Sequence, residues 1–237
     1  MQGKEAGEPG KSPAGANCVW WKEALFPERY GICRSIRDGQ RCCPKGIRAM
    51  FYDIFEPEEK PYAFRQLMKI IQRDGERLTC GFLGTRVLFH VLAQNGEVEL
   101  AYRMITGTDY PSYGYYAKNG WTTLPEQFLP KEESLHISQN HHFLGDVVQW
   151  YMRYPGGIRI ENWKKVTVHP CFIQSLTYAE AYHDLPDGRV QVKWKRDGEK
   201  IELQVICPDT VSCTVELDEE YCFVQKEDAG IYEVCRK

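Results

Sequence analysis

The hydrophobic pattern of this chain changes its period near residue 160, and this change limits the folds open to it. Before residue 160, apolar side chains recur at helical spacing, as between Phe64 and Ile71. After it, apolar and polar residues alternate, as between Val190 and Trp194. The sequence therefore predicts an α+β multidomain protein, with helices up to residue 160 and an antiparallel β-sandwich over residues 161–237.

Five segments of the first region carry the helical pattern, and turn residues separate them. They are about 47–55, 64–71, 83–92, 97–105 and 144–151. Short connections between helices favour antiparallel α-hairpins. In the second region, Asp187-Gly188 and Asp197-Gly198 bracket an alternating run, which predicts tight hairpins at both places.

Composition narrows the function classes. The net charge of −3 gives nucleic acid and anionic lipid no electrostatic target. No stretch approaches the roughly 20 apolar residues of a membrane span, and the Gly/Pro-rich start lacks the apolar core of a secretory signal. We therefore expect a disordered leader over residues 1–16, a cytoplasmic location, and neither nucleic acid nor a membrane as a partner.

The 10 cysteines contain no C-x-x-C pair, so the sequence offers no zinc-ligand spacing. A chain in which 43% of residues are hydrophobic has enough apolar side chains for a core without disulfides. Free thiols that pack as small hydrophobic groups are the favoured interpretation, and a disulfide framework is the alternative.

The strongest functional signal is the segment from Asp109 to Gln127, which reads DYPSYGYYAKNGWTTLPEQ. It has no regular periodicity, which predicts a long loop, and long loops inside compact domains are usually functional. Tyrosine and tryptophan rings with polar tips suit a sugar, and one carboxylate among rings, Glu126, is what glycoside hydrolysis uses. The alternative is that the tyrosines cover a helix end and that Glu126 is simply solvated.

Five motifs, in order, resemble those of α-L-rhamnosidases of glycoside hydrolase family 78. They are LTCGFLGT (78–85), DYPSYGY (109–115), NGWTTLPE (119–126), QNHHFLGDVVQW (139–150) and KKVTVHP (164–170). The resemblance runs from about Trp20 to the C-terminus. It implies the latter part of an (α/α)6 toroid over residues 17–160 and a C-terminal β-sandwich over residues 161–237.

The resemblance also implies roles for single residues. Glu126 matches the general base that activates water in an inverting hydrolysis of terminal α-L-rhamnosides. His141 matches a histidine that hydrogen-bonds a sugar hydroxyl; its alternative role is to cap the following helix. No cofactor and no metal are implied, and the expected partner is a carbohydrate.

Four further residues are substrate-binding candidates. Tyr113 and Trp121 are expected to stack on a sugar ring, and Asn140 and Asp109 belong to the same motifs. Their neighbours Tyr115 and Tyr116 are equally able to pack underneath the loop.

The chain departs from the family pattern at several positions. Next to the base, Pro125 replaces an aromatic residue and Gln127 replaces an arginine. Elsewhere, Tyr113 replaces a tryptophan and His142 replaces a tyrosine. The loss of a cation beside Glu126 removes one factor that keeps a carboxylate ionised. These changes bear on the substrate more than on the fold.

The family's general acid lies far upstream, in a segment resembling D-x-P-x-R-x-E, and no such segment occurs here. The carboxylates near the start of the helical region have the context of surface charge: Asp38, Asp53, Glu56, Glu58 and Glu59. We therefore expect the C-terminal portion of a longer enzyme, inactive alone and able to self-associate through exposed helix faces. Two alternatives stay open: a non-catalytic carbohydrate-binding protein, and a helical scaffold for protein contacts.

Overall fold

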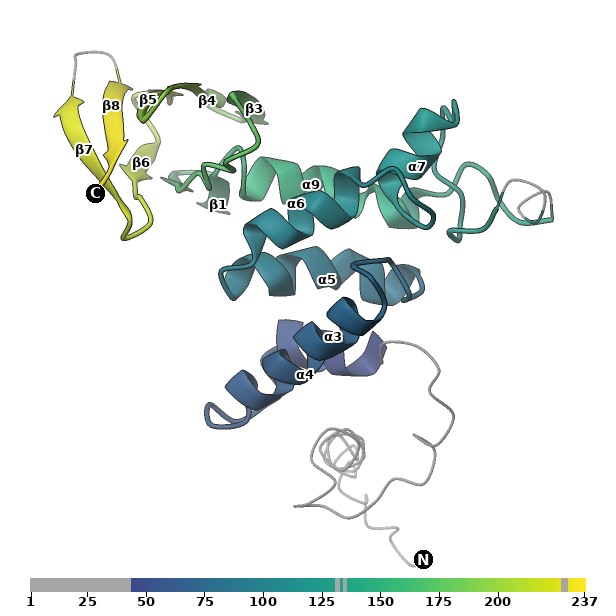
Figure 1. The fold of residues 1–237 in the computed structure, drawn as a ribbon. Helices are drawn as coiled ribbons and strands as arrows, with labels where there is room; N and C mark the ends of the chain where they lie inside the picture. The colour runs from purple at the N-terminus through teal and green to yellow at the C-terminus, as the bar shows by residue number, and fades with distance from the viewer. Residues whose placement is uncertain (1–43, 131–132, 134–135, 227–229) are drawn as a thin grey trace, which may run out of the picture.

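The computed structural model describes residues 44–237 except 131–132, 134–135 and 227–229. The predicted leader over residues 1–16 and the start of the helical region lie outside the described residues. Within them, helices are followed by strands, so the predicted order of helical region and β-sheets is confirmed (Figure 1).

The helical region contains short helices stacked in layers (Figure 1). Their bounds are α3 Pro44–Phe51, α4 Lys60–Arg73, α5 Phe82–Gln94, α6 Val98–Thr106, α7 Tyr113–Lys118, the 3-10 helix η2 His142–Asp146, and α9 Val147–Arg153. The apolar stripe from Phe64 to Ile71 lies on α4, which buries Leu67 and Ile71 against its neighbours.

Two predictions about these elements were wrong in detail. The segment from Asp109 to Gln127 is not all loop, because α7 forms within it. Ser112 caps α7 by accepting a hydrogen bond from the amide of Tyr115 (3.0 Å), a local effect that hydrophobic periodicity does not register. The helix expected over residues 144–151 begins only at Val147, because Leu144 lies within the 3-10 turn η2 that precedes α9.

Helix α5 is the centre of the helical core. The run from Val87 to Leu92 is buried along its whole length, because neighbouring elements cover several faces of the helix. The indole Nε1 of Trp150, fully buried on α9, donates to the Phe89 carbonyl at 3.0 Å. This bond satisfies the only polar atom of the indole and fixes α9 against α5.

The second region holds two sheets that share one core (Figure 1). One has the order β1-β2-β6: Ile158–Asn162, Lys165–Val168, Ser212–Val215. The other has the order β3-β4-β5-β8-β7: Tyr178–Leu185, Gly188–Asp197, Lys200–Ile206, Ile231–Arg236, Tyr221–Lys226. Both Asp-Gly hairpins are confirmed, since they connect β3 to β4 and β4 to β5. One pairing, β2 with β6, is parallel, which the expected antiparallel sandwich did not include.

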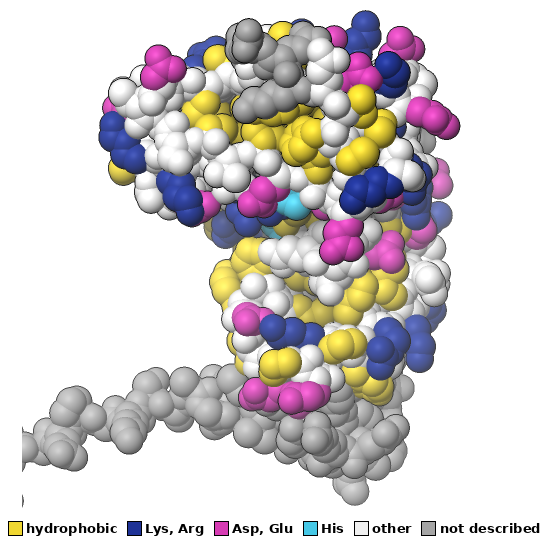
Figure 2. Space-filling view, turned by 90° about the vertical axis from the view of Figure 1, so that its left-hand side faces the viewer, with side chains coloured by type: hydrophobic (Ala, Val, Ile, Leu, Met, Phe, Trp, Pro, Cys, Tyr) yellow, Lys and Arg dark blue, Asp and Glu magenta, His cyan; other side chains and the backbone are white. Residues whose placement is uncertain are grey.

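Several contacts join the helical region to the sandwich. The Trp194 indole donates to the Pro155 carbonyl at 2.8 Å, and the Cys171 amide donates to the Tyr154 carbonyl at 2.8 Å. Ile173, which follows β2, is buried in the helical core. Hydrophobic side chains that reach the surface gather both on the sandwich and on the helical layers beneath it (Figure 2). None of the described helices is long and apolar enough to cross a membrane.

Candidate functional site

Backbone pairing brings the two strongest candidate residues onto adjacent segments. The Glu126 amide donates to the Ser138 carbonyl at 2.8 Å, and the His141 amide donates to the Leu124 carbonyl at 2.8 Å. The Thr123 hydroxyl also donates to the Gln139 carbonyl. Residues 123–126 and 138–141 therefore run side by side, so that Glu126, Asn140 and His141 belong to one paired unit.

Glu126 lies in this unit with a half-buried side chain. Pro125 before it is buried and Gln127 after it is exposed, so the chain passes from the interior to the surface at the carboxylate. A proline and a backbone hydrogen bond both restrict the backbone around Glu126. The backbone at Glu126 is therefore restricted, while its half-buried side chain still reaches water.

His141 caps η2, which was its alternative role. Its Nδ1 accepts a hydrogen bond from the Phe143 amide at 3.3 Å. A neutral imidazole that accepts at Nδ1 carries its proton on Nε2. Capping therefore does not exclude a role in binding, because it fixes the tautomer and leaves the Nε2–H as a donor.

An aromatic stack that we did not predict from the sequence supports this histidine. The ring of Phe143 lies 4.1 Å from that of His141, and it stacks on Phe82 with centroids 4.7 Å apart. Arg86 and Asp146 form an ion pair between the same two elements, α5 and η2. Both phenylalanines lie in the motifs quoted above, so the residues of this stack could be found in the sequence. Their contact could not, because about 60 residues separate them.

Tyr113 has a packing role in this structure. Its hydroxyl donates to the Leu144 carbonyl at 2.8 Å, and its ring lies 5.0 Å from Phe128 and 6.2 Å from Phe89. Burial raises the pKa of this hydroxyl well above its ordinary value. The ring is part of the helical core, so its predicted stacking on a sugar gains no support from its position and stays a prediction.

Trp121 lies at the end of α7 and is half-buried. Its ring meets the buried Tyr116 edge-to-face at 4.8 Å, and its amide donates to the Tyr116 carbonyl at 3.1 Å. Tyr116 is thus the tyrosine that packs underneath, while Trp121 keeps part of its surface in water. Asn140 and Asp109 are both exposed, Asn140 within the paired unit and Asp109 in the turn before α7.

Two of the carboxylates between α3 and α4 have structural partners. Asp53 pairs with Lys60 at 2.5 Å, and the buried Glu59 accepts a hydrogen bond from the Glu56 amide at 3.1 Å. These contacts organise the start of α4. Asp38 lies outside the described residues. No group of three metal-ligating side chains occurs within the described part of the chain.

Two cavities of the described chain lie between α9 and β3, and no candidate residue above lines either.

Comparisons with known proteins find one family model for the helical region and another for the two sheets. Residues 39–154 match the bacterial alpha-L-rhamnosidase 6 hairpin glycosidase domain, and residues 158–230 match the bacterial alpha-L-rhamnosidase C-terminal domain. An alpha-L-rhamnosidase of Formosa agariphila is 30% identical over 179 residues, 72% of this chain and 19% of the relative. One of Alteromonas sp. is 28% identical over 177 residues, 70% of this chain and 19% of the relative.

Solved structures show the same fold. The alpha-L-rhamnosidase from Dictyoglumus thermophilum superposes with a TM-score of 0.72 at 23% identity, covering 82% of this chain and 25% of that one. The Streptomyces avermitilis enzyme, solved as a complex with L-rhamnose, gives 0.70 at 23% identity and covers 81% and 20%. This chain spans about a fifth of the length of the curated relatives it matches.

Proposed function

The chain belongs to the bacterial alpha-L-rhamnosidase family, and from this premise we propose that it forms the general-base side of an active site that hydrolyses terminal α-L-rhamnosides. One observation carries the proposal: backbone pairing holds Glu126 on the segment next to His141. The L-rhamnose complex of the Streptomyces avermitilis relative supports the choice of sugar.

In the proposed mechanism, Glu126 takes a proton from a water molecule as that water attacks the anomeric carbon. The leaving oxygen is protonated on the opposite face of the sugar, so the reaction inverts the anomeric configuration. Inverting enzymes keep the two carboxyl groups about 6.5–9.5 Å apart to admit the water. The restricted backbone around Glu126 limits the reorganisation that brings its carboxylate to this water.

The surrounding residues bind the sugar. The Nε2–H of His141 donates to a sugar hydroxyl, and Asn140 and Asp109 supply further polar contacts. The partly exposed ring of Trp121 offers an apolar face to the C–H groups of the sugar. A bound hydroxyl on His141 positions the anomeric carbon relative to Glu126, which is the main contribution that we assign to this histidine.

The general acid is expected outside the described residues, because the carboxylates between α3 and α4 serve helix α4. We therefore propose that the chain alone does not turn over substrate. It becomes active when it is joined to the upstream part of a family enzyme that carries the acid.

The test is a chimera of this chain with the upstream region of the Formosa agariphila relative, assayed on p-nitrophenyl α-L-rhamnoside. Glu126→Gln is expected to lower kcat by about 10²–10⁴-fold with little change in KM, because a base acts on the transition state. His141→Gln is expected mainly to raise KM, because it removes a contact made in the ground state.

The matched control is Glu133→Gln, an exposed glutamate on the same connecting segment, which should leave both constants unchanged. An active chimera in which Glu126→Gln retains its kcat would reject the base assignment.

A second candidate function is sugar binding without catalysis. The residues that flank Glu126 favour it, since the buried Pro125 and the exposed Gln127 both depart from the family pattern. Calorimetry on the same chimera separates the two functions. Rhamnose binding that depends on Trp121 and His141, without any turnover, would establish the second one.

A further inference from the structure

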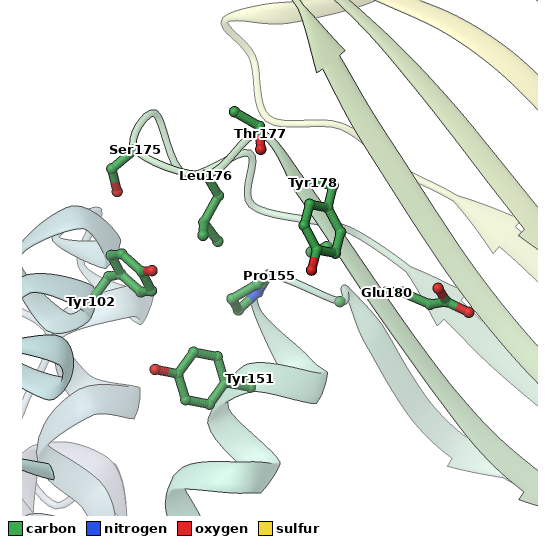
Figure 3. A pocket seen from close by; sticks show the side chains of 10 residues that line it. Tyr102, Tyr151, Pro155, Ser175, Leu176, Thr177, Tyr178 and Glu180 are labelled. Atoms are coloured by element: carbon green, nitrogen blue, oxygen red, sulfur yellow. The ribbon is translucent and has the colours of Figure 1, made fainter. Parts of the chain in front are cut away.

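Two cavities adjoin along the edge strand β3. One, of about 330 Å³, lies between α6, α9 and the start of β3 (Figure 3). The other, of about 620 Å³, continues along α9 and β3. Tyr151 and Glu180 line both, so the two cavities form a single groove. We call it the junction groove; its principal lining residues are Tyr102, Tyr151, Tyr178, Glu180, Tyr182 and Asp184.

The groove follows from the way the helical region meets the sandwich. A Cβ on Gly156 would lie 2.4 Å from the Cβ of Ala181, so only glycine allows the chain after α9 to pass this close to β3. Among the described residues, β3 is the outer strand of its sheet, so α9 lies beside a strand that pairs along one edge only. The space between helix and strand forms the groove.

Aromatic side chains line it. Tyr178 and Tyr182 are 64% and 52% exposed, and they lie on the same face of β3. Four residues of strand separate them by about 13 Å, the span of a short sugar chain rather than of a single sugar. Figure 3 shows the rings of Tyr102, Tyr151 and Tyr178 around Pro155 and Leu176.

Polar groups between these rings are held in place by cross-strand partners. Glu180 accepts a hydrogen bond from Gln191 Nε2 at 2.6 Å. Arg189 binds both oxygens of Asp184, at 2.7 and 3.1 Å, and its guanidinium carbon lies 4.0 Å from the ring centroid of Tyr182. Glu180 also lies 4.0 Å from Lys193 Nζ, so both carboxylates that line the groove have an opposite charge beside them, which favours a neutral ligand over an anion or a cation.

We propose that the junction groove binds a neutral oligosaccharide, at a second sugar site distinct from the one around Glu126. The exposed tyrosine rings take the apolar C–H faces of successive sugars, while the carboxylate of Glu180 accepts hydrogen bonds from sugar hydroxyls. The inference rests on the proposed function only for the identity of the sugar.

The test is calorimetric titration of the full chain with linear rhamnotriose and, separately, with L-rhamnose. Rhamnotriose is expected to bind more tightly, since it reaches both Tyr178 and Tyr182. Tyr178→Ala and Tyr182→Ala should each weaken its binding by about fivefold, as expected for the loss of one ring contact. Tyr52→Ala, which removes an equally exposed ring (64%) directly after α3, should have no effect.

Glu126→Gln separates this proposal from the proposed function. Rhamnotriose binding that survives Glu126→Gln and is lost in the Tyr178 and Tyr182 variants supports the groove, whatever the chimera does in catalysis. Absence of rhamnotriose binding, or binding that only Glu126→Gln or Trp121→Ala weakens, overturns it.

A separate observation concerns two cysteines of the sandwich. Cys222 on β7 and Cys235 on β8 are directly opposite one another in the register, and their Sγ atoms are 3.4 Å apart. Directly opposite residues of antiparallel strands have Cα atoms about 4.5–5.5 Å apart, which lies within the range of disulfides. Both side chains are partly exposed, so a small oxidant reaches them.

We infer that Cys222 and Cys235 form a disulfide when the chain meets a low-molecular-weight disulfide such as oxidised glutathione. One thiolate attacks the glutathione disulfide and releases a reduced glutathione. The second cysteine then displaces the other glutathione. The two thiols lose two protons and two electrons, and one oxidised glutathione becomes two reduced ones.

The full chain is treated with oxidised glutathione, alkylated, digested and mapped by mass spectrometry. A crosslink between the peptides of Cys222 and Cys235 is expected, and Cys222→Ser should abolish it. Cys80 and Cys171 should remain alkylatable thiols after unfolding, since burial raises the pKa of both and lowers their reactivity. A crosslink between any other pair, or none, overturns the inference.

Discussion

His90 on α5 illustrates how the interior sets the charge state of one side chain. It is buried, and its Nδ1 lies 3.4 Å from the hydroxyl of Tyr154. Burial, with a smaller effect from Arg153, lowers its pKa from 6.5 to about 4. Below pH 6.5 the unfolded chain therefore takes up a proton that the folded chain does not.

The direction of the pH effect follows. Because the folded pKa is the lower one, the free energy of unfolding falls as the pH drops from 6.5 towards 4. For this residue alone the loss is at most about 1.4 kcal/mol per pH unit. Urea unfolding of the wild type and of His90→Leu at pH 7 and pH 5 measures it, since the variant should lose less stability between these values.

His136→Leu is the control, because that histidine is exposed, and its pH dependence should match that of the wild type. Identical pH dependence of wild type and His90→Leu would contradict the assignment.

The second prediction about a single residue concerns Tyr113. Tyr113→Phe removes the hydrogen bond to the Leu144 carbonyl, which leaves a partly buried acceptor, so we expect a loss of about 1 kcal/mol in the free energy of unfolding. Tyr178→Phe, at an exposed ring, should change the stability little. An unchanged stability of Tyr113→Phe together with weakened rhamnose binding would return this residue to the sugar-binding role.

At the scale of elements, α7 depends on close contact with the end of α6. A Cβ on Gly114 would lie 2.3 Å from the Thr106 carbonyl oxygen and 2.5 Å from that of Gly107. Both atoms belong to the backbone, so no side chain can move aside. The glycine of the aromatic segment is therefore a packing requirement, because α7 must sit directly on the end of α6.

We expect Gly114→Ala to displace α7 and to lower the free energy of unfolding by about 1–3 kcal/mol, as overpacking does. Gly145→Ala is the matched control, since a Cβ there meets nothing within 4 Å. Thermal unfolding by circular dichroism measures both variants. Equal midpoints for the two would show that α7 does not depend on this contact.

Elements with a strong local pattern were predicted well from the sequence. The stripe on α4 and the Asp-Gly turns around β4 are examples, because amphipathic periodicity and turn residues act over a few neighbouring positions. Helix α7 was missed because its cap, Ser112, and its docking on α6 outweigh the absence of a helical stripe. The parallel pairing of β2 with β6 joins residues about 47 apart, which no local pattern encodes.

At the scale of the whole molecule, the chain spans about a fifth of the relatives' length, so its helices are expected to meet further segments in a complete enzyme. Leu83 and Val148 are 45% and 60% exposed on α5 and α9. We expect the chain alone to self-associate or to bind 8-anilinonaphthalene-sulfonate. Light scattering and dye fluorescence measure this, and Leu83→Gln with Val148→Gln should reduce both signals.

A monodisperse monomer that binds no dye would show that these helix faces do not need further segments packed against them. The pair Ile206→Gln and Ile54→Gln, also at exposed apolar positions, controls for a general effect of added polarity.

The sequence by itself determined the order of the two regions, the main helices and hairpins, and the family, because these depend on local periodicity, turn residues and short motifs. It also placed Glu126 and His141 in separate motifs without a link between them. Only the tertiary structure joined their segments through the bonds to Ser138 and Leu124, and only it put Tyr113 into the core. The physical reason is that such contacts join residues distant in the chain, and their geometry depends on how all the elements pack together.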